Sequence, residues 1–74
     1  MNAGQRVRLW RRRRGRSQQW LADALGLTRA SVCRIEKGIQ GPSAAQVAEI
    51  AFALGLSEAE FYGPDAAVEE PAAS

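Results

Sequence analysis

Residues 17–38 read SQQWLADALGLTRASVCRIEKG, and this stretch decides the fold. Ser17 and Thr28 are good N-cap residues, because a side-chain oxygen there can accept from the free backbone N–H groups that begin a helix. Gly26 supplies the left-handed conformation that a tight turn requires. Ala22 places only a methyl group where two steeply crossing helices approach each other. The stretch therefore predicts two short helices that meet at a close corner.

Glycines and cap residues divide the rest of the chain in the same way. Ser43 with Gln46, and Ser57 with Glu60, have the spacing of capping boxes. The sequence predicts helices over residues 3–14, 18–25, 29–37, 44–54 and 58–61. Helical spacing places Val7, Trp10 and Arg14 on one stripe of the first helix. In the other helices it turns these residues inward: Leu21, Ala22, Leu25, Val32, Ile35, Val47, Ile50, Ala51 and Leu54. No segment alternates as a strand does, so the predicted class is all-α, a compact domain of five helices.

Length and composition exclude several classes of protein. With 74 residues the chain has room for one domain with a small core. It has no histidine and a single cysteine, Cys33, which excludes Ser-His-Asp triads, Cys-His dyads, His-based metal sites and an internal disulfide. No stretch approaches the ~18 apolar residues of a membrane span. We expect an intracellular binding module with no cofactor and no metal, and not an enzyme.

The charge is distributed unevenly along the chain. Residues 1–16 contain seven arginines and no acid, whereas residues 63–74 contain three acids and no base. A basic end of this density is typical of a protein that binds a polyanion. It also fits a helix face that is simply solvated, and charge alone does not decide between these two interpretations. The Pro/Ala-rich residues 63–74 predict an acidic, disordered tail after a domain over residues 1–62.

A longer pattern extends over residues 4–62. It consists of Gly4-Gln5-Arg6-Val7-Arg8, Arg11, Ser17-Gln18, Leu21-Ala22, Leu25-Gly26, Ser31-Val32, Ile35-Glu36, Gly38, Pro42-Ser43, Ile50-Ala51, Ala53-Leu54-Gly55 and Phe61-Tyr62. Because these residues occur jointly, the chain resembles the phage-repressor and Cro type of helix-turn-helix domain, often called the Xre-type. The resemblance implies a lambda-repressor-like fold and a transcriptional repressor or regulator that binds double-stranded DNA.

The resemblance makes the helix over residues 29–37 the recognition helix, which would lie in the major groove. With Val32 and Ile35 turned inward, its outward residues are Arg29, Ala30, Cys33, Arg34 and Lys37. Arg29 and Arg34 are the predicted base readers, since arginine can donate two hydrogen bonds to guanine O6 and N7. Phosphate contact is the alternative for each of them.

Two smaller side chains complete the predicted base contacts. Ala30 and Cys33 can pack on a thymine methyl, or their small size can simply let the helix lie deep in the major groove. Oxidation of Cys33 could in principle switch binding off. A lone cysteine without a visible activating partner gives that idea little support.

The predicted phosphate contacts surround the two capped helices. They are Ser17, Gln18, Thr28, Lys37 and Gln40. The N–H groups and dipole at a helix start favour a phosphate, and the resemblance implies that Gln18 binds the sugar-phosphate backbone. Gln40 lies in a loop where the family often has basic residues, so its contact should be weaker.

The resemblance also implies a partly buried ion pair between Arg11 and Glu36, which would tie the first helix to the third. The alternative is two solvated side chains, and the other arginines of residues 12–16 should mostly point to solvent. Three residues depart from the family pattern, and two of them lie at the start of the second helix. Trp20 stands where Glu usually completes a capping box, and Arg16 stands where an apolar residue usually forms a hydrophobic staple.

Phe52 lies opposite the core stripe of its helix, where the family usually has a polar residue. With Ala48 it forms the predicted dimer interface, although an isolated exposed aromatic is common.

Taken with the resemblance and the charge, these residues predict a sequence-specific DNA-binding regulator, a homodimer on a palindromic operator, in the cytoplasm with the nucleoid. The second hypothesis is an antitoxin-like or phage accessory protein that mainly binds a protein partner, a toxin or another regulator. RNA binding is less favoured, because no aromatic stacking platform is evident.

Overall fold

Five helices follow one another along residues 1–64, the part of the chain that the computed structural model describes. They are α1 (Ala3–Arg13), α2 (Gln18–Leu25), α3 (Arg29–Glu36), α4 (Ala44–Ala53) and α5 (Glu58–Tyr62). No strand occurs within these residues. The predicted all-α fold is confirmed, and each helix begins and ends within one residue of its predicted bounds. The predicted disordered tail falls largely on residues 65–74, which lie outside the described residues.

Polar side chains cap the start of each helix. Ser17 and Thr28 accept hydrogen bonds from backbone N–H groups in the first turns of α2 and α3, and the two predicted capping boxes begin α4 and α5. A third capping box begins α1, where Asn2 N donates to Gln5 Oε1 at 2.8 Å and Gln5 N donates to Asn2 Oδ1 at 2.9 Å. The sequence prediction overlooked this Asn2 cap, although asparagine is a favoured residue there.

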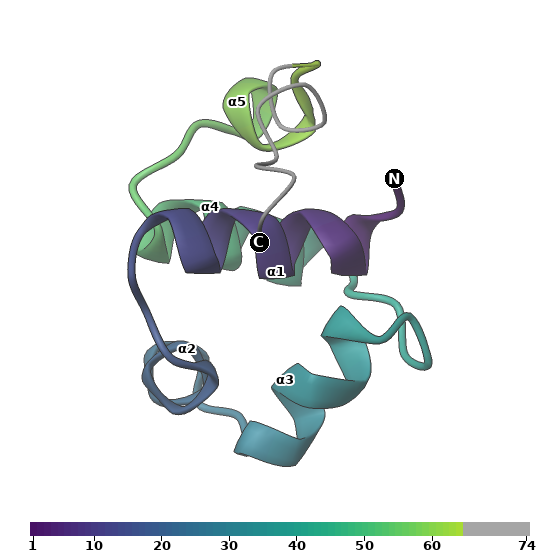
Figure 1. The fold of residues 1–74 in the computed structure, drawn as a ribbon, viewed down its shortest axis with the longest axis vertical. Helices are drawn as coiled ribbons and strands as arrows, with labels where there is room; N and C mark the ends of the chain where they lie inside the picture. Colours follow the sequence, from purple (N-terminus) through teal and green to yellow (C-terminus); the bar gives the residue numbers. More distant parts are fainter. Residues whose placement is uncertain (65–74) are drawn as a thin grey trace.

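The core lies between α1 and its neighbours on both sides. In Figure 1, α2 and α3 lie on one side of α1 and α5 lies on the other, and contacts join α1 to both α3 and α5. The largest fully buried side chains are Phe61, Leu21, Ile35, Ile50, Val7 and Val32. Trp10, on the predicted stripe of α1, and Leu25, a predicted core residue, are only partly buried at its margin. Leu9 was not predicted and is buried, because α1 is covered on more than one side.

Two close approaches fix the position of α3. At the corner between α2 and α3, Ala22 is fully buried and Gly26 has a φ of +69°, as the turn was predicted to require. At the other end of α3, a Cβ on Gly4 would overlap the carbonyl oxygen of Ile35. Only glycine allows α1 to lie this close to α3, so the corner and the Gly4 contact hold α3 at both of its ends.

Candidate nucleic-acid interface

One face of α3 is turned to solvent and carries the residues predicted to contact bases. Val32 and Ile35 are each 1% exposed and fix the inner face of the helix. The opposite face presents exposed Arg29, Ala30 and Arg34 beside a partly buried Cys33. Figure 1 places α3 on the side of α1 away from α5, at the edge of the molecule. The four side chains share one accessible surface, and their contact with bases stays a prediction.

The two predicted base readers differ in how they are held. Arg34 Nη2 donates to Ser31 Oγ at 3.2 Å, and Arg34 Nε donates to Gln40 Oε1 at 3.5 Å. Ser31 Oγ itself accepts from Thr28 Oγ1 at 3.0 Å. No hydrogen bond or ion pair within residues 1–64 holds Arg29, which lies at the first position of the helix. Sequence reasoning treated the two arginines alike, because these partners are set by side-chain geometry.

The predicted phosphate contacts lie around the two capped helix starts and the end of α3. Ser17, Thr28, Lys37 and Gln40 are exposed, and Gln18 is partly buried. Ser17 Oγ accepts from Trp20 N at 3.0 Å, so its hydroxyl is first a cap. Gln18 Nε2 donates to Glu36 Oε1 at 3.1 Å. This bond orients the Gln18 amide and leaves one of its two N–H donors free for another acceptor.

A buried ion pair joins α1 to the end of α3. Arg11 Nε lies 2.6 Å from Glu36 Oε2, and Arg11 Nη2 donates to Glu36 Oε1 at 3.0 Å. The side chains are 11% and 3% exposed, respectively. Arg11 Nη1 also donates to the carbonyl oxygen of Arg16 at 2.7 Å, which fixes the turn before α2. One guanidinium group thus positions α1, α3 and the start of α2 relative to one another.

Other arginines of α1 and its C-cap bind the carbonyl ends of helices. Arg14 Nε donates to the carbonyl oxygen of Leu54 at 2.8 Å, at the end of α4. Arg6 Nη1 donates to the carbonyl oxygens of Phe61 and Gly63, each at 3.2 Å, at the end of α5. The last carbonyls of a helix lack intrahelical partners and carry partial negative charge, so a cation there stabilises them. These two arginines contribute to the fold even though Arg14 remains exposed.

The two departures at the start of α2 contact each other. Arg16 Cζ lies 4.5 Å from the centroid of the Trp20 ring. Trp20 provides no carboxylate for a capping box, and Arg16 provides no apolar side chain for a staple, as the sequence indicated. The two side chains form a cation–π contact instead, which is worth about 0.5–1 kcal/mol at an exposed site.

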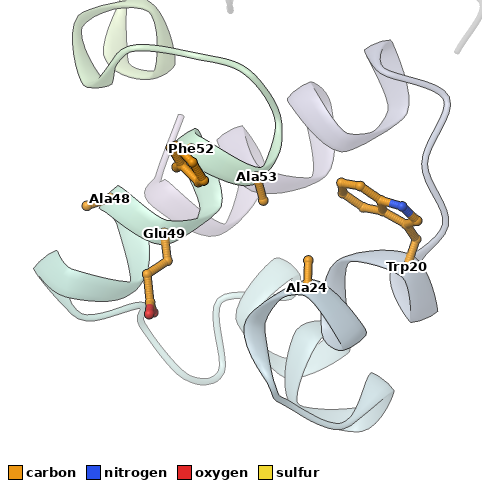
Figure 2. Close-up of a pocket in the computed structure, with 6 residues that line it drawn as sticks. All are labelled: Trp20, Ala24, Ala48, Glu49, Phe52 and Ala53. Carbon is orange, nitrogen blue, oxygen red and sulfur yellow. The ribbon is translucent and has the colours of Figure 1, made fainter.

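An apolar groove lies between α2 and α4. We call it the α2–α4 groove, and it encloses about 510 Å³. Its walls are Trp20 and Ala24 from α2 and Ala48, Glu49, Phe52 and Ala53 from α4, as Figure 2 shows. Phe52 is 87% exposed. The two residues predicted as a dimer interface therefore belong to a hollow surface. Sequence reasoning missed the contributions of Ala24 and Ala53, which only the packing of α2 on α4 brings together.

Two other kinds of site are absent from residues 1–64. No group of three His, Cys, Asp or Glu side chains gathers there as a metal site would require. No helix in that range combines the length and the apolar character needed to cross a membrane.

Five capped helices, with a cationic face on the exposed third helix, define a helix-turn-helix DNA-binding domain. The family described as "Helix-turn-helix domain" matches residues 3–61, and the chain belongs to this family. The DNA-binding domain of the P22 c2 repressor, residues 1–76, has the same fold with a TM-score of 0.78. The two chains are 20% identical over 88% of this chain and 86% of that one.

Three regulators are more similar in sequence. The uncharacterised HTH-type transcriptional regulator YazB of Bacillus subtilis (strain 168) is 36% identical over 84% of this chain and 90% of its own. The restriction-modification controller protein C.AhdI of Aeromonas hydrophila is 35% identical, with a TM-score of 0.74 over 81% of this chain and 91% of its own. The clp gene regulator ClgR of C. glutamicum is 26% identical, with a TM-score of 0.79 over 95% and 90%. The chain is thus a DNA-binding domain of the transcriptional-regulator type, not an enzyme.

Proposed function

We propose that this protein is a small transcriptional regulator, acting as a repressor, which binds a specific sequence of double-stranded DNA with α3 in the major groove. The observation that carries the proposal is the division of α3 into two faces. Val32 and Ile35 are 1% exposed, while Arg29 and Arg34 project from the opposite, exposed face. A helix clamped from behind in this way presents its outer side chains to a groove as a rigid unit.

The geometry supports separate roles for the proposed contacts. Arg34, held by Ser31 and Gln40, presents its guanidinium group to guanine O6 and N7. Arg29 reads a second base from the tip of the helix. Ala30 and Cys33 are small enough to let the helix approach closely, and either can pack on a thymine methyl.

Phosphate contacts would fix the register of the domain on the duplex without reading its sequence. We assign them to Ser17, Gln18, Thr28, Lys37 and Gln40. The N–H groups that begin α2 and α3 add partial positive charge at Gln18 and Thr28.

Because double-stranded DNA is the proposed ligand, we place the protein in the cytoplasm with the nucleoid.

We propose further that two copies bind together as a homodimer, with Ala48 and Phe52 at the interface. The support is the α2–α4 groove, where a phenylalanine that is 87% exposed lies beside an apolar hollow. Burying such a surface is favourable by about 25 cal/mol per Å². Two α3 helices related by a two-fold axis would read half-sites about 34–36 Å apart, which requires a palindromic operator.

Selection of bound sequences from a random duplex pool tests the function. We expect a symmetric motif with two half-sites, and wild-type binding should weaken steeply as the salt concentration rises. Recovery of unselected sequences, together with a flat salt response, would contradict sequence-specific binding.

The dimer has a test of its own. A Phe52→Glu variant should shift the protein towards monomer in analytical ultracentrifugation while its circular dichroism stays helical. If dimers persist in this variant, the interface lies elsewhere.

The alternative of an antitoxin-like or phage accessory protein is not favoured. The family and the similar chains are regulators, and the cationic face of α3 is not explained by a protein partner. Charge reversal of Arg29 and Arg34 separates the two functions, since it should abolish DNA binding and spare binding to a protein.

A further inference from the structure

A basic hollow of about 330 Å³ lies between α1 and α3. We call it the α1–α3 hollow. Six of the residues that line it are Arg8, Arg11 and Arg12 from α1 and Cys33, Glu36 and Lys37 from α3 and its C-cap. Cys33 and Lys37 also belong to the surface assigned above to DNA. The hollow is therefore continuous with the outer face of α3.

The acid that lines this hollow is already neutralised. Glu36 accepts two hydrogen bonds from Arg11 and one from Gln18. Arg8, Arg12 and Lys37 remain as exposed cations. Within residues 1–64, none of these three side chains forms an ion pair or a hydrogen bond. The hollow thus carries three unpaired positive charges and no free negative charge from its walls.

The cations of the hollow come from two segments, α1 and the end of α3, that are held at a fixed distance from each other. The two-bond ion pair of Arg11 with Glu36 and the close approach of Gly4 to Ile35 lock α1 against α3. Cations held together in a concave surface attract an anion more strongly than the same charges spread over a flat one. The fixed spacing of the two helices also means that no backbone rearrangement has to be paid for on binding.

We propose that the α1–α3 hollow binds phosphates of the DNA backbone that flank the groove entered by α3. The proposal rests on the function given above and adds α1 to the surface that touches DNA. Arg8 and Arg12 donate charge-assisted hydrogen bonds to the free phosphate oxygens, and Lys37 contributes a point charge. Such contacts raise affinity for every sequence equally, because phosphates carry no sequence information.

Salt dependence provides the first test. Binding of the selected duplex and of an unrelated duplex is measured by fluorescence anisotropy at several salt concentrations. In the Arg8→Gln/Arg12→Gln variant, affinity should fall by the same factor for both duplexes. The slope of log K against log salt should become shallower by about 1 for each arginine removed. Arg14→Gln is the control for a charge removed from the same basic run but outside the hollow, and its slope should equal that of the wild type.

Cys33 provides a second test that needs no DNA. It lines the hollow and is the one cysteine in the chain, so its reaction rate reports the local potential. The protein reacts in parallel with an aromatic disulfide that carries two carboxylates and with a neutral dipyridyl disulfide. Both reagents are attacked by the thiolate, so the ratio of the two rates cancels any change in thiol ionisation. At low salt the double variant should lower this ratio by up to about fivefold per charge, and Arg14→Gln should leave it unchanged.

The outcomes separate this inference from the proposed function. If the wild type binds DNA and the double variant keeps its affinity and salt slope, the hollow is not a phosphate site, while the proposed function stands. Loss of affinity for the selected duplex alone would show that Arg8 or Arg12 reads bases, which also overturns the inference. An unchanged ratio of disulfide rates would show that the hollow does not attract anions. A wild type that binds neither duplex overturns the function and the phosphate site together.

Discussion

The arginines of residues 6–14 form one basic run in the sequence, but the fold divides them between two surfaces. Arg6 and Arg14 donate to the carbonyl oxygens that end α5 and α4, and Arg13 Cζ lies 5.0 Å from the centroid of the Trp10 ring. Arg8 and Arg12 line the α1–α3 hollow instead. They have no hydrogen-bond or ion-pair partner within residues 1–64. The first group stabilises the domain, and the second group is available to a ligand.

This division shows that the number of charges in a segment does not measure its capacity to bind a polyanion. A guanidinium group that donates to helix carbonyls retains its charge but has used hydrogen bonds that a phosphate would need. Arg11 belongs to both surfaces, because it lines the hollow while its donors are engaged by Glu36 and by the carbonyl oxygen of Arg16. For the arginines of residues 6–14, the groups that each side chain contacts therefore decide its role.

The largest expected effect comes from breaking the buried pair that joins the two surfaces. Arg11→Met should lower the free energy of unfolding by about 3–5 kcal/mol, because Glu36, whose side chain is 3% exposed, would be left buried without its cation. Urea denaturation monitored by circular dichroism gives this value. The double variant Arg11→Met/Glu36→Leu should recover much of the loss. Equal stability of the single variant and the wild type would show that the pair is too well solvated to matter.

The second effect separates side chains that read bases from side chains that contact phosphates. Arg34→Ala should weaken discrimination at one base pair of the operator by about 1–3 kcal/mol, because the lost side chain is a two-bond donor. Competition binding against duplexes substituted at each position measures this. Lys37→Ala, its control on the same helix, should weaken binding to all duplexes alike. A uniform loss in Arg34→Ala would reassign that residue to a phosphate.

The third effect compares one arginine from each group directly. Arg14→Gln should destabilise the domain by about 1 kcal/mol, since it removes the hydrogen bond to the carbonyl oxygen of Leu54. Arg12→Gln removes the same charge but no such bond, so its effect should stay within about 0.5 kcal/mol. Thermal melting of the two variants gives the difference. Equal losses would mean that net charge, and not the partner, decides the contribution.

Local chemistry made much of the fold predictable. Cap residues such as Ser17 and Thr28 and turn glycines such as Gly26 act within one turn of their own position, and the predicted helix bounds agree with the structure to within one residue. The pairing of Arg11 with Glu36 was available only from the resemblance, because its two residues are far apart in the sequence.

The site was less predictable, because it depends on distant packing. The separation of Arg12 from Arg14 requires knowing that the carbonyl oxygen of Leu54 lies beside α1. The walls of the α2–α4 groove likewise combine Ala24 with Ala53, which are small residues without a signal of their own. Asn2 was a missed local signal, since an asparagine followed by Gln5 marks a helix start.

The smallest expected effect concerns Glu60, whose pKa is lowered from its usual value. The backbone N–H and the hydroxyl of Ser57 are the main causes, outweighing the weak opposing effect of burial, and the positive charge of Arg14 adds a smaller lowering. Because the pKa is lower in the folded state, the ionised carboxylate contributes stability above its ordinary pKa. This contribution is lost as the pH falls through the lowered value.

Titration of the Glu60 carboxyl carbon by NMR can therefore detect which arginines lie on its side of α1. Arg14→Gln should raise the pKa of Glu60 slightly towards its usual value, and Ser57→Ala should raise it more, because it removes the hydroxyl group that helps to lower it. Arg12→Gln should leave the pKa unchanged, since Arg12 lines the α1–α3 hollow. An equal shift in both arginine variants would mean that the two groups of arginines act as one diffuse charge.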